Sequence, residues 1–185
     1  MSTSPTIASV AQYDIDPTHS NAQFKVRHMM ISNVKGEFTK IAGKVAFDPA
    51  NPGGASIDVT IDATSISTRD PQRDEHLKSA DFLDVANHPS IAFRSKKVTP
   101  AGKDAYEITG DLTIRGATRE VKLLADSVTP EAKDPWGGAR RGATATTTIN
   151  RKDFGLGWNM ALETGGIMVG EEVHITLDVE LVRKA

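Results

Sequence analysis

The sequence predicts an all-β protein, an antiparallel sandwich or barrel interrupted by one short helix. Apolar and polar residues alternate strictly in long segments, most clearly in residues 173–181, where every odd position is apolar. Successive side chains of a strand point to opposite faces, so each segment has one dry and one wet face, as in antiparallel sheets. The segments follow one another at regular spacing, separated by turn residues such as Pro52-Gly53-Gly54. The aromatic content of 5% is low for a solid core and favours a partly empty interior.

Length and composition favour one domain and exclude several classes of function. A chain of 185 residues can bury a core of its own, and we expect a flexible leader at 1–12 and a folded domain at 13–185. The net charge of −2, with basic residues spread along the chain, argues against nucleic-acid binding. The chain has no cysteine, which excludes disulfides and thiolate metal sites. We see neither a signal peptide nor a run of roughly 20 apolar residues, so we expect a cytoplasmic protein without a transmembrane segment.

The strands can be placed in order from the alternation and the turns. A short strand is expected at 13–16, where Asp16-Pro17 starts a turn. Eight longer strands are expected at 22–30, 36–47, 55–67, 90–99, 104–114, 118–128, 141–151 and 172–183.

Two segments depart from the strand pattern. Residues 69–86 have helical spacing, with Asp70 as N-cap and Pro71 at the first helical position. The apolar stripe of this helix consists of Leu77, Ala80 and Leu83. A lone helix among strands most simply covers an open end of a barrel. Residues 155–170 are glycine-rich but apolar, and such a loop needs a surface to lie on or a ligand to cover.

Two polar side chains fall on the dry faces of strands. His28 shares its face with Phe24 and Val26 and is either a core histidine bonded to the backbone or a polar contact in a ligand pocket. Arg151 has the parity of Ile149, and it either recognises a phosphate or carboxylate or forms a surface ion pair.

The predicted helix carries charged residues that have a simple structural interpretation. Asp74 and His76 are two positions apart and face away from each other on a helix, and no nucleophile is marked nearby. A solvated helix face is one interpretation, and contact of Arg73 or His76 with the anionic end of a ligand is the other. The histidines have no metal-binding spacing, so we expect no metal, no cofactor and no catalytic residue.

Taken together, the motifs resemble those of the YceI-like family, the lipocalin-like polyisoprenoid-binding proteins, from about residue 13 to residue 183. The motifs are DPTHS (16–20), FKVRH (24–28), VKGEF (34–38), RDEHL (73–77) with SADF (79–82), GDLTIRG (110–116), NRKDFG (150–155) and VGEEV (169–173). The resemblance implies an extended eight-stranded antiparallel lipocalin-like barrel with one short inserted helix. It also implies a homodimer and an elongated cavity for one polyisoprenoid, isoprenoid quinone or fatty-acid-type lipid. Many members are exported, and this chain departs from them in lacking a signal peptide.

From the strand parity and the resemblance together we expect a soluble binding protein for a long-chain isoprenoid or other amphiphilic lipid, for transport, storage or sensing. The lipid tail is expected among Phe24, Val26, Phe38, Ile61, Phe93, Leu112 and Ile114. A cover is expected from Leu77, Phe82, Trp158 and Met160. The polar head is expected near His28, Arg73, His76 and Arg151. Two alternatives stay open: an enzyme acting on an isoprenoid-type substrate in the same cavity, which needs a pair of inward titratable groups, and a structural dimer with a filled interior.

Overall fold

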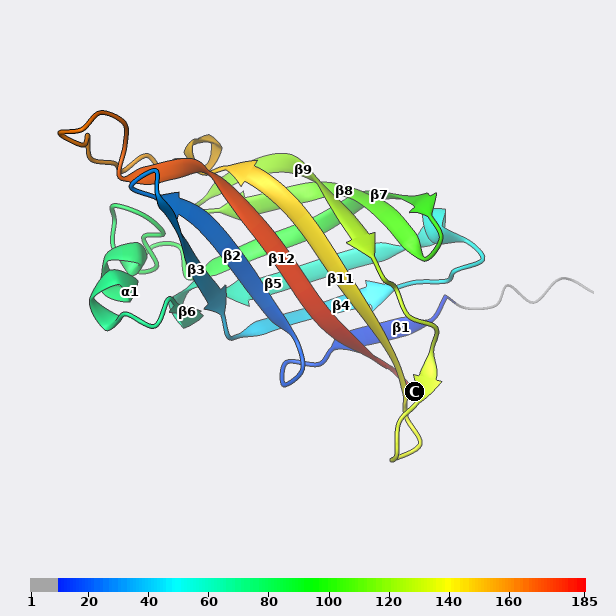
Figure 1. Cartoon of the computed structure of the whole chain (residues 1–185). Helices are drawn as coiled ribbons and strands as arrows, with labels where there is room; N and C mark the ends of the chain where they lie inside the picture. The colour runs from blue at the N-terminus through cyan, green and yellow to red at the C-terminus, as the bar shows by residue number, and fades with distance from the viewer. Residues whose placement is uncertain (1–9) are drawn as a thin grey trace, which may run out of the picture.

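The computed structural model describes residues 10–185, and these form an antiparallel sheet with one α-helix, α1, at Pro71–Lys78 (Figure 1). The strands are β1 Gln12–Ile15, β2 Asn21–His28, β3 Ser32–Phe38, β4 Ile41–Ala46, β5 Ser56–Asp62, β6 Ile66–Ser67, β7 Ser90–Gly102, β8 Ala105–Ile114, β9 Ala117–Asp126, β10 Ala132–Lys133, β11 Ala139–Asn150 and β12 Val169–Arg183. Three short 3₁₀ helices are η1 Pro52–Gly54, η2 Ala63–Ser65 and η3 Arg151–Phe154.

The sheet closes on itself as an eight-stranded antiparallel barrel, which confirms the predicted fold class. Its strands follow the order β11-β9-β8-β7-β5-β4-β1-β12, and pairing of β11 with β12 closes the ring. β1 pairs with the last residues of β12, and β2 continues along the same edge of β12 from Asp178 to Val169. In the same way, β3 pairs with β2 and β4 pairs with β1, while β6 pairs with β3 and β5 pairs with β4. Three positions in the barrel are therefore each occupied by one long strand broken into two pieces: β1 with β2, β4 with β3, and β5 with β6.

These breaks correct two of the expected strands. Residues 36–47 divide at Thr39 and Lys40 into β3 and β4, and β3 already begins at Ser32. Residues 55–67 divide at η2, because the Asp62 carboxylate accepts the backbone N–H of Thr64 at 2.9 Å and turns the chain.

The helix is shorter than the expected range of 69–86. Asp70 caps it as expected, accepting the backbone N–H groups of Gln72 and Arg73, each at 3.1 Å. The helix ends at Lys78 with Ser79 as its C-cap, and the chain then folds back so that the Leu83 N–H donates to the Leu77 carbonyl at 2.9 Å. Leu77 and Leu83 therefore meet through a turn instead of one helical face, while Ala80 is exposed.

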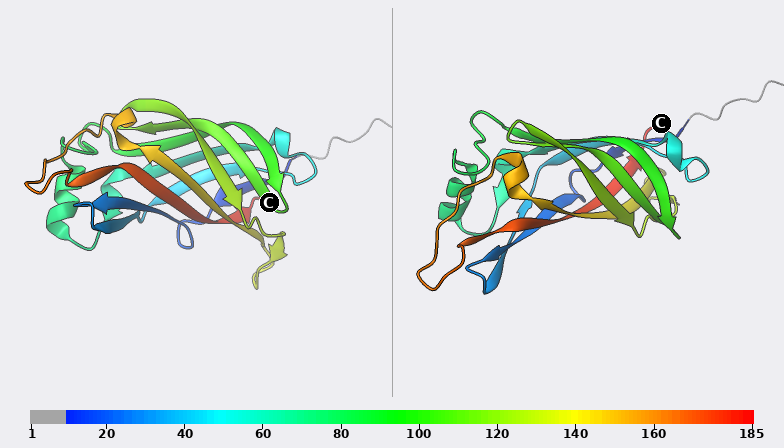
Figure 2. Two further views of the ribbon diagram at one scale, coloured as in Figure 1. Left: turned by 45° about the horizontal axis from the view of Figure 1, so that its top comes forward. Right: turned by 90° about the horizontal axis from the view of Figure 1, so that it is seen from above.

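The two ends of the barrel differ. α1 and the loop of residues 155–168 lie at the same end in all the views, which we call the α1 end (Figure 2). The opposite end is closed by packed aromatic side chains, with the rings of Phe47 and Tyr106 edge to face at 5.2 Å and Tyr13 fully buried. The guanidinium of Arg141 lies 5.4 Å from the centre of the Phe47 ring. We therefore expect a ligand to enter the interior through the α1 end.

The start of the chain is described only in part. Of the leader expected at 1–12, residues 1–9 lie outside the described residues, and Gln12 already belongs to β1. Within residues 10–185, no helix is both long enough and apolar enough to cross a membrane.

Candidate functional site

The barrel encloses a cavity of about 390 Å³, within the usual range for small-molecule sites. The alternation that predicted the strands forms its wall, since one parity of each strand faces inward. On β12 the inward residues are Val173, Ile175, Leu177, Val179 and Leu181. Inward glycines make room for large rings: a side chain at Gly110 would collide with the ring of Phe93, which lies across it. The interior is therefore lined by apolar side chains but not filled by them.

The polar part of the wall is small and lies mainly at one end. The polar or charged lining residues are Gln23, Arg27, His28, Arg73, His76, Thr147 and Arg151. Those from the end of β2, from α1 and from η3 gather at the α1 end. None of the described residues in the wall is Asp or Glu, so this end of the cavity is cationic in character.

The structure brings nearly all the predicted site residues to this one cavity. The wall includes Phe24, Val26, His28, Phe38, Ile61, Arg73, His76, Leu77, Phe82, Phe93, Leu112, Ile114, Arg151 and Trp158. Met160 is the exception, because its side chain is 53% exposed and it does not line the cavity. Their contact with a ligand stays a prediction.

The prediction missed much of the wall on β9, β11 and β12. Leu123, Ala145 and Ile175 are examples, and all three have the inward parity of their strand. The signal was present in the sequence, since β12 has the cleanest alternation in the chain.

Within residues 10–185, Arg151 forms neither a surface ion pair nor an open anion site, because its hydrogen bonds go to backbone carbonyls. Its side chain is 3% exposed, and it donates to the backbone carbonyls of Leu156, Trp158 at 2.9 Å, Val169 at 3.2 Å and Gly170 at 2.7 Å. These bonds use four of the five N–H donors of the guanidinium. Burial lowers the pKa of Arg151. The residue therefore fastens the loop of residues 155–168 to the start of β12, and little of it is left for a ligand head group.

His76 belongs to an aromatic cluster at the α1 end. Its ring lies edge to face against Phe82 at 5.1 Å and against Trp158 at 4.8 Å, and Phe82 and Trp158 are 5.4 Å apart. Its Nε2 is 2.9 Å from an oxygen of Asp81. The cluster joins α1, the turn after it and the 155–168 loop, so these separate segments cover the cavity as one unit.

Arg73 and His28 keep polar atoms free at the same end. Arg73 donates through Nε to the Thr68 hydroxyl and through Nη2 to the Thr68 carbonyl, both at 2.8 Å, while its Nη1 has no hydrogen bond to the described residues. His28 is half-buried in the wall, and its ring has no hydrogen-bond partner within residues 10–185. A core histidine bonded to the backbone is therefore not what the structure shows.

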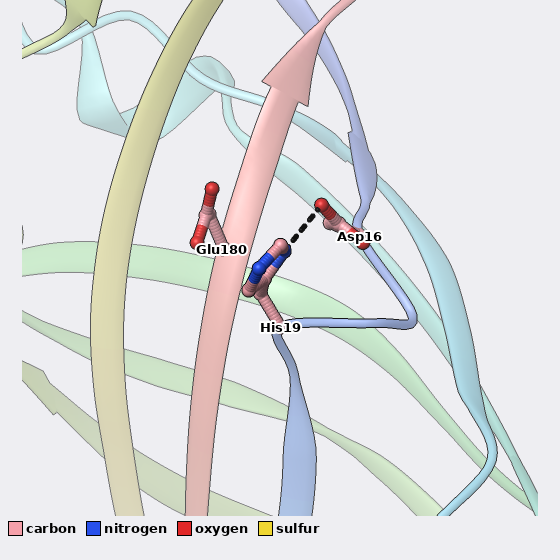
Figure 3. Close-up of side chains that lie close together, drawn as sticks. All are labelled: Asp16, His19 and Glu180. Carbon is pink, nitrogen blue, oxygen red and sulfur yellow. Dashed lines mark hydrogen bonds and ion pairs between the residues drawn. The ribbon is translucent and has the colours of Figure 1, made fainter. Parts of the chain in front are cut away.

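The described residues contain one close group of metal-ligating side chains, Asp16, His19 and Glu180, and it lies outside the cavity wall (Figure 3). Arg140 already supplies the positive charge there, with Nη1 at 2.7 Å from Asp16 and 2.8 Å from Glu180. Hydrogen bonds from Thr18, His19 and Arg140 hold the pKa of Asp16 well below its usual range, and the bond to Asp16 raises the pKa of His19. We interpret this group as a clamp between the turn after β1 and the strands β11 and β12.

The comparisons with known proteins agree with this architecture. A family model described as a YceI-like domain matches residues 13–181. The UPF0312 protein of Ectopseudomonas mendocina is 37% identical over 96% of this chain and 90% of its own length. A UPF0312 protein of Vibrio cholerae is 38% identical over 82% of this chain and 81% of its own.

Solved structures show the same fold. BcnA of Burkholderia cenocepacia superposes with a TM-score of 0.79 at 26% identity, covering 90% of this chain and 98% of that one. A polyisoprenoid binding domain from Saccharophagus degradans superposes with a TM-score of 0.68 at 12% identity, covering 93% of this chain and 98% of that one, which shows the fold alone. With the family model covering almost the whole barrel, the chain belongs to the YceI-like family.

Proposed function

We propose that this protein binds one long-chain amphiphile, with the hydrocarbon chain in the barrel cavity and the head group at the α1 end. The ligand is a polyisoprenoid, an isoprenoid quinone or a fatty-acid-type lipid. One observation carries the proposal: a cavity of about 390 Å³ has a wall that is apolar along the barrel and polar mainly at one end. That distribution matches the chemistry of an amphiphile.

The energetics favour a chain over a polar ligand. Each methylene buried contributes roughly 0.8 kcal/mol, less the cost of ordering the chain. Apolar cavities tend to stay dry, so a chain entering this one does not have to displace well-bonded water. A polar ligand would instead lose its hydrogen bonds to water along most of the cavity.

The head group has its partners at the α1 end. The Nη1 of Arg73 and the ring nitrogens of His28 are the polar atoms best placed to meet it, because neither has a hydrogen-bond partner among residues 10–185. His76 lies at the same end. Since the wall there holds arginines and histidines but no carboxylate, an anionic or hydrogen-bond-accepting head fits best.

The relatives support binding more than catalysis. The Saccharophagus degradans domain with this fold is described as polyisoprenoid binding, and its likeness supports the same class of ligand here. Acid–base catalysis in the cavity would need two titratable groups with separated pKa values facing the ligand, and the described part of the wall contains no Asp or Glu. Among residues 10–185, the one carboxylate bonded to a wall histidine, that of Asp81 at 2.9 Å from His76, is not itself part of the wall. We therefore propose a protein that carries, stores or senses its lipid. The homodimer and the cytoplasmic location stay predictions.

Native mass spectrometry of the purified full chain, followed by organic extraction and lipid analysis, tests the proposal. We expect one long-chain lipid per chain that survives transfer into the gas phase. A chain that carries no lipid, and that takes none up from a mixture of isoprenoid and fatty-acid lipids, would contradict it. Recovery of a chemically altered lipid after incubation would favour the enzyme instead.

A further inference from the structure

We propose that the β2–β3 turn, Met29-Met30-Ile31, docks this barrel onto an anionic lipid bilayer and so places the α1 end of the cavity at the membrane. The inference rests on the proposed function in one respect, because docking gives a membrane lipid a short path to the cavity. The turn lies at the α1 end beside the 155–168 loop (Figure 1).

The first observation is the exposure of large apolar side chains. Met29 is 39% exposed, Met30 55% and Ile31 74%, and Met160 of the neighbouring loop is 53% exposed. Backbone bonds hold them together: the Met29 N–H donates to the Met168 carbonyl at 2.7 Å, and the Met168 N–H donates to the Met160 carbonyl at 2.9 Å. We call these four exposed residues, Met29, Met30, Ile31 and Met160, the apolar rim.

The second observation is that the turn conformation disfavours these residues. Met29 and Met30 both have positive φ, at 50° and 64°, and the Ile31 N–H donates to the His28 carbonyl at 3.1 Å. This is the pattern of a type I′ turn, which strongly prefers Asn-Gly. Methionine is therefore conformationally disfavoured here, and although Met30 packs beside Gly166, about half of its surface stays exposed. Packing within the barrel does not account for the apolar surface that stays exposed, above all on Ile31 at 74%, while insertion into a bilayer does.

The third observation is positive charge directly behind the rim. Lys25 and Arg27 on β2 and Lys35 on β3 are exposed, and none forms an ion pair within residues 10–185. Lys25 lies opposite Lys35 in the sheet register, an arrangement of like charges that weakens a sheet. Arg27 reaches the turn itself, where its Nη2 donates to the Met30 carbonyl at 3.1 Å.

Acidic side chains near this patch are fewer than the basic ones directly behind the rim. Glu37 lies two positions from Lys35 on β3, farther from the turn, and Glu172 lies at the start of β12. Glu163 lies in the 155–168 loop, while Glu171 is paired with Lys152. An apolar tip with a cationic flank matches the layered structure of an anionic membrane surface, where apolar side chains enter the acyl boundary and lysines meet the head groups.

The apolar rim also lies at the end of the barrel through which we expect a lipid to enter the cavity. The cavity wall includes the exposed Arg27, the half-buried His28 and Met168, all within a few residues of the apolar rim. The other end of the barrel is closed by Tyr13, Phe47 and their neighbours.

Flotation with vesicles of phosphatidylcholine alone, or of phosphatidylcholine and phosphatidylglycerol in equal parts, tests the proposal on the full chain. We expect binding to the anionic vesicles that weakens as salt is added. The triple variant Met29→Asn/Met30→Gly/Ile31→Ser should lose roughly ten-fold or more of this binding. Because Asn-Gly suits the turn, this variant should fold at least as well as the parent. Lys25→Gln and Lys35→Gln should each lower binding about five-fold.

A matched control comes from the far end of the molecule. Trp136 is 83% exposed on the β10–β11 hairpin, and Trp136→Ser should leave flotation unchanged. Equal flotation of the parent and the triple variant would overturn the proposal. So would a triple variant that changes the oligomeric state in sedimentation without changing flotation, which would make the rim a contact between copies of this chain. Lipid retained by the triple variant in native mass spectrometry separates a failure of docking from a failure of the proposed function.

Discussion

Replacing Arg151 with methionine tests whether this buried arginine holds the cover of the cavity in place. Its guanidinium satisfies four backbone carbonyls of the 155–168 loop and of the start of β12. At ~1 kcal/mol for each hydrogen bond, their loss amounts to about 4 kcal/mol. Carbonyls in the loosened loop regain water and the cost of burying the charge disappears, so we expect a net loss of about 3 kcal/mol in the free energy of unfolding.

Urea denaturation measures this loss, and thermal unfolding should show a midpoint lower by roughly 6–12 °C for a chain of this size. Hydrogen exchange of the loop amides should become faster in Arg151→Met. The neighbouring Lys152→Met is the control, because its exposed ion pair with Glu171 should matter little. A loss below about 1 kcal/mol with unchanged exchange would refute the structural role, because it would fall within the range of ordinary surface substitutions. An altered head-group preference without loss of stability would restore the role expected from the sequence.

Three further predictions concern the rest of the cavity and the clamp. His28→Leu should fold normally but retain lipids with a different head group, as read by lipid analysis after extraction; unchanged retention would make His28 a wall residue only. Trp158→Ala removes the ring that joins α1 to the loop, so bound lipid should dissociate faster in a transfer assay while the barrel stays folded by circular dichroism. The pKa of Asp16 is lowered on folding, so its contribution is present above the unfolded value of roughly 4 and is lost as the pH falls below it. Arg140→Met should therefore be less stable at neutral pH and should lose less of its stability on acidification, whereas the raised pKa of His19 acts in the opposite sense and its contribution fades as the pH rises.

The barrel and its lining could be predicted because strand parity depends on local sequence. Residues such as Phe24, Val26 and Leu112 alternate with polar neighbours, and a period of two leaves one choice of inward face. The closure of the sheet came from the family resemblance, because parity alone does not distinguish a sandwich from a barrel.

Other features depend on partners that are distant in the sequence. Strand parity predicts the inward direction of Arg151 but not its role, because the carbonyls that it binds belong to residues up to 19 positions away. The turn at Met29 and Met30 contains no glycine or asparagine, the residues that usually mark such turns. The sequence therefore predicts that the strand beginning at residue 22 continues to residue 30, whereas β2 ends at His28. The sequence predicts too long a helix because Leu83 keeps helical spacing, although in the structure it packs through a turn.

A pair of variants on β11 tests the central claim most directly. Ala145 faces the cavity and Thr146 faces solvent, so Ala145→Phe fills the cavity while Thr146→Phe adds the same ring outside. Both variants should keep the barrel, with a destabilisation of about 1–3 kcal/mol for the overpacked Ala145→Phe. Native mass spectrometry then measures the lipid bound per chain. We predict that Ala145→Phe loses most of the lipid and that Thr146→Phe keeps it; equal lipid in a folded Ala145→Phe and in Thr146→Phe would show that the ligand does not lie in the barrel.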